Sequence, residues 1–169
     1  VGSSCLNGEV FEIAQTRNAQ QLEEVISFYD YVEIQPLSNY MYLVERDSIA
    51  SVERLKEILQ AIIDAADKLG IPVVATGDAH YVHPRDKMIR DIYISSQAIG
   101  GVRHPLYIYN QEKRHRFKAP DQHFRTTTEM LKEYEWIKND RAYEFVVENS
   151  RKIAEQIQPV MPVKDRLYP

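Results

Sequence analysis

Two short stretches suited to β-strands flank the longest helical pattern in the chain, and this order constrains the fold most. Residues 31–35 alternate with period two and stop at Pro36, which predicts a strand with two different faces. Residues 71–76 form a continuous apolar run with proline confined to its start, which is typical of a strand covered on both faces of a parallel sheet. Strand, helix and strand in this order predict a βαβ unit, and therefore an α/β fold.

The alternation in the first strand does not by itself decide which face points inward. One face carries Tyr31, Glu33 and Gln35, and the other carries Val32 and Ile34. Both assignments remain open from the sequence.

The helix between the strands is expected over about residues 48–68, after a loop that contains Ser38 and Asn39. Gly70 follows it as a C-cap residue. Apolar residues recur in the helix at steps of three and four, which indicates either a core-facing helix or, less often at this length, a coiled-coil seam. They are Val52, Leu55, Leu59, Ile62, Ala66 and Leu69.

Other helical patterns occupy both ends of the chain. Thr126 and Glu129 are spaced as a capping box before an apolar run, whereas residues 100–123 lack an apolar period and are expected to be mostly loop. Further helices are expected within residues 8–28 (two, broken near 16–18), 84–98 (with Pro84 in the first turn), 126–131 and 141–157, before an extended tail over 163–169. The last helix is expected to bury Ala142, Phe145, Val146, Ile153 and Ile157.

Composition excludes several classes of protein. Charged residues make up 27% and hydrophobic residues 44% of the 169 residues, as in ordinary globular proteins. No apolar run approaches the roughly 18–20 residues that cross a bilayer, which excludes a membrane span. A net charge of −4 is too mild to indicate a broad nucleic-acid surface. The one basic cluster, Lys113–Lys118, could contact phosphates or be a solvated loop.

Cys5 is the only cysteine, which excludes an intramolecular disulfide and a four-cysteine zinc site, and makes a reducing cytoplasm the default compartment. The chain begins at Val1 without a signal pattern. Two parallel strands cannot close a barrel or complete a doubly wound sheet. We therefore expect the chain to be a segment of a longer protein.

The strongest candidate for chemistry follows the second strand, at the end of a parallel sheet where functional residues collect. Asp78 and His80 are two residues apart, so in an extended conformation both side chains point the same way. A carboxylate and an imidazole that converge form half of a divalent-metal site, and Gly77 permits a turn there. The alternative is that Asp78 caps the next turn while His80 bonds a loop carbonyl.

Cys5 could supply a thiolate to a zinc-like metal or be a small buried hydrophobe. The other histidines do not pair with a second ligand at helical spacing, so loop or surface roles are favoured; they are His83, His104, His115 and His123. The chain also lacks a Walker-type loop, a dinucleotide fingerprint and a serine nucleophile elbow.

Six stretches, in order, carry a resemblance to a known family: residues 1–9, 28–36, 72–81, 123–131, 142–154 and 162–169. They include Val-Gly-Ser-Ser-Cys-Leu-Asn-Gly-Glu at the start and Ala-Thr-Gly-Asp-Ala-His-Tyr after the second strand. Together they closely resemble the PolC-type DNA polymerase III alpha subunits of low-GC Gram-positive bacteria. The matching region is the C-terminal half of the polymerase and histidinol phosphatase (PHP) domain, just before the polymerase palm.

This resemblance implies a partial (β/α)7 PHP-type barrel followed by a C-terminal helical region. The family's barrel holds up to three divalent metals through nine ligands, and three of those motif positions are Cys5, Asp78 and His80. Zinc or manganese is implied for this cluster, and magnesium for the parent polymerase. The polymerase and exonuclease catalytic residues fall outside the matched region, so no catalytic residue is expected in this segment.

The resemblance also implies a division of the chain. Residues 1–100 correspond to the C-terminal half of the PHP domain, 101–123 to a loop region and 124–169 to a helical connection towards the palm. The implied partners are DNA, replisome subunits and the missing N-terminal half of the PHP domain, in the cytoplasm and without a membrane. An isolated segment could also self-associate through its open sheet edge.

Three functions are compatible with these features. The segment could be a metal-stabilised scaffold within a replicative polymerase whose parent chain is the enzyme. It could instead belong to a stand-alone, metal-dependent PHP phosphoesterase, which the extended 124–169 region argues against. It could also be a non-enzymatic module whose Lys113–Lys118 loop binds DNA or a partner.

Overall fold

The computed structural model describes residues 1–96, 99–110, 119–137 and 141–161. It is a mixed α/β fold around two parallel strands, β1 (Val32–Ile34) and β2 (Val73–Ala75). Val32 pairs with Val73 and Ile34 with Ala75, so the predicted βαβ unit is confirmed. In the described part of the chain the sheet is open and two-stranded, and a barrel is not formed.

The first residues run beside β1 and extend the sheet by one isolated bridge. Gly2 bridges Tyr31 in parallel, and the amide of Ser3 donates to the carbonyl of Tyr31 at 3.2 Å. A Cβ atom at Gly2 would lie 2.4 Å from the Tyr31 ring, so a larger residue there would require the Tyr31 side chain to move. The N-terminal residues therefore lie along the open edge of β1.

The packing of β1 decides between its two possible inward faces. Val32 and Ile34 are fully buried in the hydrophobic core, whereas Tyr31 and Glu33 are partly exposed. The apolar pair is therefore the core-facing side. Gln35, beyond the strand, is nevertheless buried at 2% exposure.

Helix α4 (Val52–Leu69) is the predicted connection between the strands. It starts four residues later than expected because the hydroxyl of Ser51 accepts from the amide of Arg54 and caps the helix there. Gly70 ends it in the left-handed conformation, with φ of 68°. The recurring apolar residues are buried except at the two ends of the helix, because the helix packs against β2, against residues 37–45 and against the two helices that precede β1, rather than in a coiled coil.

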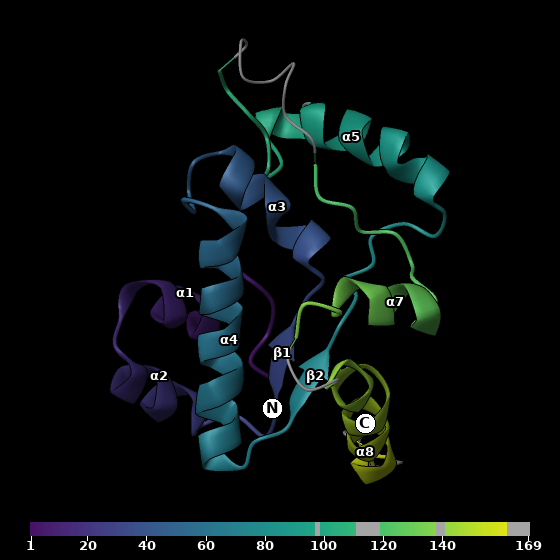
Figure 1. Cartoon of the computed structure of the whole chain (residues 1–169). Coiled ribbons are helices and arrows are strands. Elements are labelled where there is room, and N and C mark those ends of the chain that lie inside the picture. The colour runs from purple at the N-terminus through teal and green to yellow at the C-terminus, as the bar shows by residue number, and fades with distance from the viewer. Residues whose placement is uncertain (97–98, 111–118, 138–140, 162–169) are drawn as a thin grey trace, which may run out of the picture.

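Those two helices are α1 (Glu9–Thr16) and α2 (Ala19–Ile26), which confirm the predicted pair and its break. The side chain of Asn18 accepts from the amide of Gln21 and so starts α2 immediately after the break. Both helices pack on the side of α4 away from β2 (Figure 1).

Helix α3 (Leu37–Glu45) occupies residues for which the sequence predicted a loop, so that prediction is wrong. Its tyrosines and asparagine are weak helix formers, so the local sequence does not favour a helix. Tertiary packing overrides this weak preference: Tyr40 and Tyr42 are buried, and Tyr40 stacks on Phe11 with ring centroids 5.1 Å apart.

The C-terminal region packs on the other side of the sheet from α4 (Figure 1). Helix α7 (Thr127–Glu133) has the predicted capping box. The last predicted helix consists of a π-helical turn, η4 (Glu144–Glu148), and α8 (Asn149–Gln156). Phe145 is fully buried as expected, but Ile157 is 73% exposed because α8 ends before it. The predicted tail at 163–169 lies outside the described residues.

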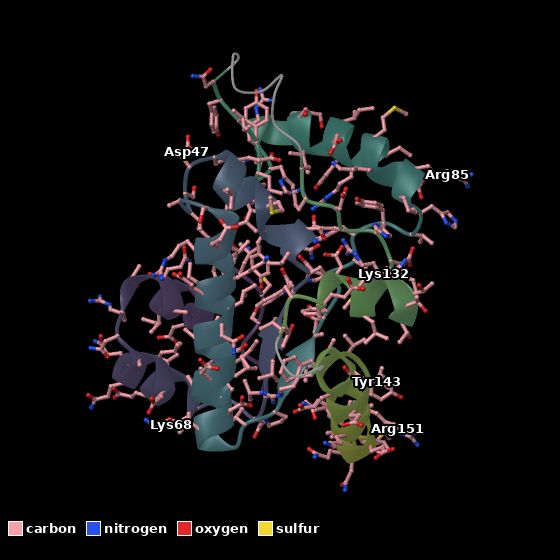
Figure 2. The ribbon with its side chains drawn as sticks, in the orientation of Figure 1. Asp47, Lys68, Arg85, Lys132, Tyr143 and Arg151 are labelled. Atoms are coloured by element: carbon pink, nitrogen blue, oxygen red, sulfur yellow. The ribbon has the colours of Figure 1, made fainter. Side chains whose placement is uncertain are left out.

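The predicted helix at 84–98 is a short 3-10 turn, η1 (Pro84–Asp86), followed by α5 (Lys87–Ser95). Another 3-10 turn, η2 (Ile99–Gly101), follows, and the described residues up to 123 are otherwise irregular, as predicted. Helix α5 lies apart from the sheet, and Arg85, in η1 just before it, points away from the rest of the molecule (Figures 1 and 2). Every helix in the described ranges is too short or too polar to cross a bilayer.

Candidate metal centre

Asp78 and His80 come together just beyond the carboxyl end of β2. Oδ1 of Asp78 lies 3.3 Å from Nε2 of His80, and both side chains are partly exposed. The predicted convergence is confirmed, but its expected cause is wrong. Asp78 has φ of 46°, so the backbone is left-handed there and not extended, and a turn brings the two side chains together.

The buried side-chain amide of Asn39 holds this turn by a hydrogen bond. Nδ2 of Asn39, in α3, donates to the carbonyl of Gly77 at 3.1 Å, and Asn39 is 1% exposed. Gly77 itself does not have a positive φ, and a Cβ there would make an ordinary contact with Met130. The strained residue is therefore Asp78 rather than the expected glycine.

Gln122, near the end of the irregular region before α7, also holds this turn by hydrogen bonds. Nε2 of Gln122 donates to Oδ2 of Asp78 at 2.7 Å, and the amide of His80 donates to the carbonyl of Gln122 at 2.8 Å. Tyr81 and His123 then form an isolated parallel bridge. Gln122 carries no motif and lies 44 residues from Asp78, so sequence patterns did not single it out.

Cys5 lies in a turn that precedes α1 and is partly buried. Its Sγ receives one long contact from Nδ2 of Asn7, at 3.8 Å. Burial raises the pKa of the Tyr40 phenol. The hydrogen bond with the backbone of Gln35 lowers this pKa, whereas the charges of Cys5 and Asp78 raise it further. Among the described residues Cys5 is not grouped with Asp78 and His80 as a metal-holding set, so the role of Cys5 as a ligand stays a prediction.

Among the described residues, no group of three or more His, Cys, Asp or Glu side chains is placed to hold a metal ion. Asp78 and His80 nevertheless suit a divalent cation as two donors of a larger set, because one oxygen and one nitrogen face each other. Oε1 of Gln122 and Oδ1 of Asn39 are buried without a hydrogen-bond partner. The structure thus brings two possible donors together, and the metal site itself stays a prediction.

Among the described residues, the histidines other than His80 lie in loops and turns, as predicted. His83 takes part in the capping box of η1. Nδ1 of His104 accepts from the amide of Leu106 at 3.0 Å, and burial, together with the charges of Arg90 and His80, lowers the pKa of His104. His115 and the Lys113–Lys118 cluster lie outside the described residues.

A buried arginine joins α7 to α3 and was not singled out from the sequence. Nη2 of Arg125 donates to Oγ of Ser38 at 2.8 Å, and Nε lies 3.5 Å from Oε1 of Glu133. Oγ of Ser38 also donates to Glu133 at 3.0 Å. The Arg125 side chain is only 2% exposed, so this cluster fixes the segment that begins at Gln122.

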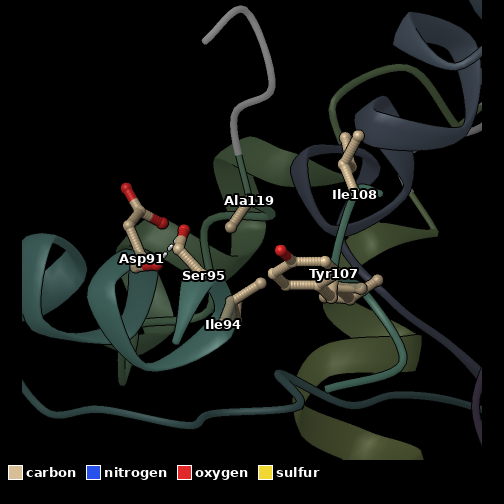
Figure 3. A pocket seen from close by; sticks show the side chains of 7 residues that line it. Asp91, Ile94, Ser95, Tyr107, Ile108 and Ala119 are labelled. Carbon is tan, nitrogen blue, oxygen red and sulfur yellow. Dashed lines mark hydrogen bonds between the residues drawn. The ribbon is translucent and has the colours of Figure 1, made fainter. Parts of the chain in front are cut away.

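A separate pocket lies between α5 and the irregular segment (Figure 3). Its volume is about 60 Å³, well below the roughly 300–1,000 Å³ of ordinary ligand sites. Asp91, Ser95 and Tyr107 are among its lining residues. It does not include Cys5, Asp78 or His80, and its size suits only water-sized molecules.

Comparison with known proteins places this geometry in context. The chain matches no protein-family model. It is 44% identical over 168 residues to the DNA polymerase III PolC-type of Halalkalibacterium halodurans, and 40% identical to that of Staphylococcus aureus. In each case the match covers 99% of this chain and 11% of the relative. The chain is therefore homologous, over nearly its whole length, to a segment of bacterial DNA polymerase III of the PolC type.

Proposed function

We propose that the chain is the C-terminal half of the PHP domain of a PolC-type DNA polymerase III, and that it acts mainly as a scaffold. The observation that carries this proposal is the paired Asp78 and His80 at the carboxyl end of β2, in a chain 44% identical to a polymerase segment. In this proposal residues 1–100 complete a (β/α)7 barrel, 101–123 are a loop region and 124–169 connect to the palm.

Cys5, Asp78 and His80 would hold a divalent cation, zinc or manganese, with ligands from the other half of the domain. Asp78 offers a hard oxygen, and His80 offers a neutral nitrogen. A bound cation of this kind acidifies water and polarises phosphoryl oxygens. Within this chain, the backbone turn at Asp78 orients the two donors, and their contact at 3.3 Å sets where a cation would lie.

The polymerase and exonuclease activities, the magnesium they need, DNA and the replisome partners belong to the proposed parent protein in the cytoplasm. The segment itself is expected to be inactive because it supplies three ligands of nine and no catalytic carboxylates for polymerisation. Alone, it should bind divalent metal weakly, since the ion would remain mostly hydrated.

The test uses the full-length polymerase that carries this segment. Tightly bound zinc and manganese are measured by elemental analysis after dialysis, for the wild type and for Cys5→Ser, Asp78→Asn and His80→Ala. We expect each substitution to lower the metal content and the thermal stability while polymerase activity at low temperature is largely retained. Unchanged metal content in all three variants would overturn the metal site.

The same preparations separate the scaffold from a phosphoesterase. An exonuclease-inactive polymerase is assayed for hydrolysis of a phosphomonoester with and without manganese. Metal-dependent hydrolysis that Asp78→Asn abolishes would replace the scaffold role with a phosphoesterase role. The absence of such hydrolysis, together with lost stability, is the outcome expected for a scaffold.

A further inference from the structure

We propose that Gln122 is a positioning residue for the Asp78 carboxylate, a role that rests on the metal site of the proposed function. Nε2 of Gln122 donates to Oδ2 of Asp78 at 2.7 Å. The orientation of this amide follows from chemistry, because an ionised carboxylate only accepts hydrogen bonds and an amide oxygen in that place would be repelled. The contact joins two segments that are 44 residues apart.

This hydrogen bond gives the two carboxylate oxygens of Asp78 different roles. Oδ2 is held by Gln122, whereas Oδ1 faces Nε2 of His80 at 3.3 Å. A cation bound between Asp78 and His80 would therefore take Oδ1, while Oδ2 keeps the carboxylate plane fixed. Partners of this kind orient metal-binding carboxylates and strengthen metal affinity.

The side chain of Gln122 is not needed to hold its own backbone in place. The backbone carbonyl of Gln122 accepts from the backbone amide of His80 at 2.8 Å. The backbone amide of Gln122 donates to the hydroxyl of Tyr81 at 3.0 Å. The amide of Phe124 donates to the carbonyl of Tyr81 at 2.8 Å. These backbone hydrogen bonds would survive a change of side chain, so the effect of Gln122 on Asp78 can be separated from folding.

Burial strengthens the contact. Gln122 is 5% exposed, so water competes poorly for its Nε2, and a hydrogen bond to a charged acceptor is strong there. Its Oε1 is buried without a partner, and a buried unpaired acceptor has an energetic cost. The hydrogen bond from Nε2 to the Asp78 carboxylate offsets part of this cost.

The first test is made on this chain without metal. The NH₂ protons of Gln122 are followed by NMR in the wild type and in Asp78→Asn, whose neutral amide weakens the acceptor. We expect slow exchange and a displaced resonance in the wild type, and at least a tenfold faster exchange in Asp78→Asn. Equal exchange in both proteins would mean that the hydrogen bond is absent, and would overturn the inference.

The second test measures metal retention in the full-length polymerase by competition with a chelator. Gln122→Met keeps the volume and removes the donor, and should lower the affinity for zinc or manganese about tenfold, within the 10–100-fold range typical of such partners. In an Asp78→Asn background the same change should have no further effect, because Gln122 acts through Asp78. A merely structural role would weaken both backgrounds equally.

Gln15→Met is the matched control, because Nε2 of Gln15 donates to the carbonyl of Phe11 one turn earlier in the same helix, α1. The outcomes separate the two proposals. If Asp78→Asn retains metal like the wild type, the metal site of the proposed function fails. If Asp78→Asn loses metal but Gln122→Met does not, only the role of Gln122 fails.

Discussion

The helical body around α4 and the segment around α5 differ in packing and in charge. Leu55, Leu59 and Ile62 of α4 are at most 2% exposed, whereas Met88 and Ile92 of α5 are 68% and 62% exposed. Both helices are amphipathic in sequence. An apolar helix face is therefore buried only where other elements cover it, and few of the described residues cover α5.

The two regions also differ in net charge. Residues 80–125 carry nine Lys and Arg against four Asp and Glu, a net charge of +5, and contain all five histidines. With a total of −4, the rest of the chain carries −9. The basic segment also exposes apolar side chains of α5, among them Met88 and Ile92.

The largest effect is expected from comparing the same substitution in the two regions. Ile62→Ala should lower the free energy of unfolding by about 2–5 kcal/mol, because it leaves a cavity in the core. Ile92→Ala should change it by less than about 0.5 kcal/mol, because Ile92 is already exposed. Urea unfolding of both variants measures this. Equal losses would mean that α5 is as well packed as α4.

A smaller effect on the free energy of unfolding is expected from the contact between the C-terminal helices and α4. Arg141 bonds Asp67 at 2.5 and 2.9 Å and Glu144 at 2.8 and 3.0 Å. Arg141→Met should lower the free energy of unfolding by about 1–2 kcal/mol, because paired, partly buried hydrogen bonds to carboxylates are lost. Arg151→Met is the control, since its pair with Glu155 is exposed and should contribute little. Similar values for both would contradict a specific role of Arg141.

The pH dependence of unfolding checks the same contact. Hydrogen bonds from Arg141 lower the pKa of Glu144 below its ordinary value of 4.5. The stabilisation is therefore fully present above about pH 4.5 and is lost as the pH falls through the folded-state pKa. Arg141→Met should flatten the loss of stability below pH 4.5 in urea titrations. An unchanged acid limb would show that other carboxylates dominate.

The cap of α7 should contribute about 1 kcal/mol. The amide of Glu129 donates to Oγ1 of Thr126, and the Glu129 carboxylate accepts from the amide and hydroxyl of Thr126. Thr126→Ala removes the side-chain part of this box and should lower the free energy of unfolding by about that amount. Thr128→Ala, inside the helix and exposed, should be close to neutral.

The smallest effect on stability is expected from the exposed face of α5, and it tests whether the expected self-association of the isolated chain uses this face rather than the open sheet edge. Met88→Ser with Ile92→Ser should reduce the sedimenting mass at high concentration while the free energy of unfolding hardly changes. A chain that is already monomeric at high concentration would remove the basis for this expectation.

Local patterns were sufficient for much of the fold. The period of three and four in α4, the caps at Gly70 and Thr126, and the break between α1 and α2 each depend on a few neighbouring residues, and the structure confirms them. The parallel pairing of β1 with β2 followed from the length of the crossover between two strand-like runs. The sequence also placed Asp78 and His80 together.

Tertiary structure decided what local patterns do not encode. Helix α3 forms because Tyr40 and Tyr42 are buried against the core, and Ile157 is exposed because α8 ends before it. The left-handed turn at Asp78 and the contact from Gln122 depend on segments that are 44 residues apart. Helical periodicity and helix caps depend on interactions between residues that are close in the sequence, so the sequence alone determined them. The side chains that hold the turn at Asp78 come from distant segments, so only the packing of the folded chain brings them there.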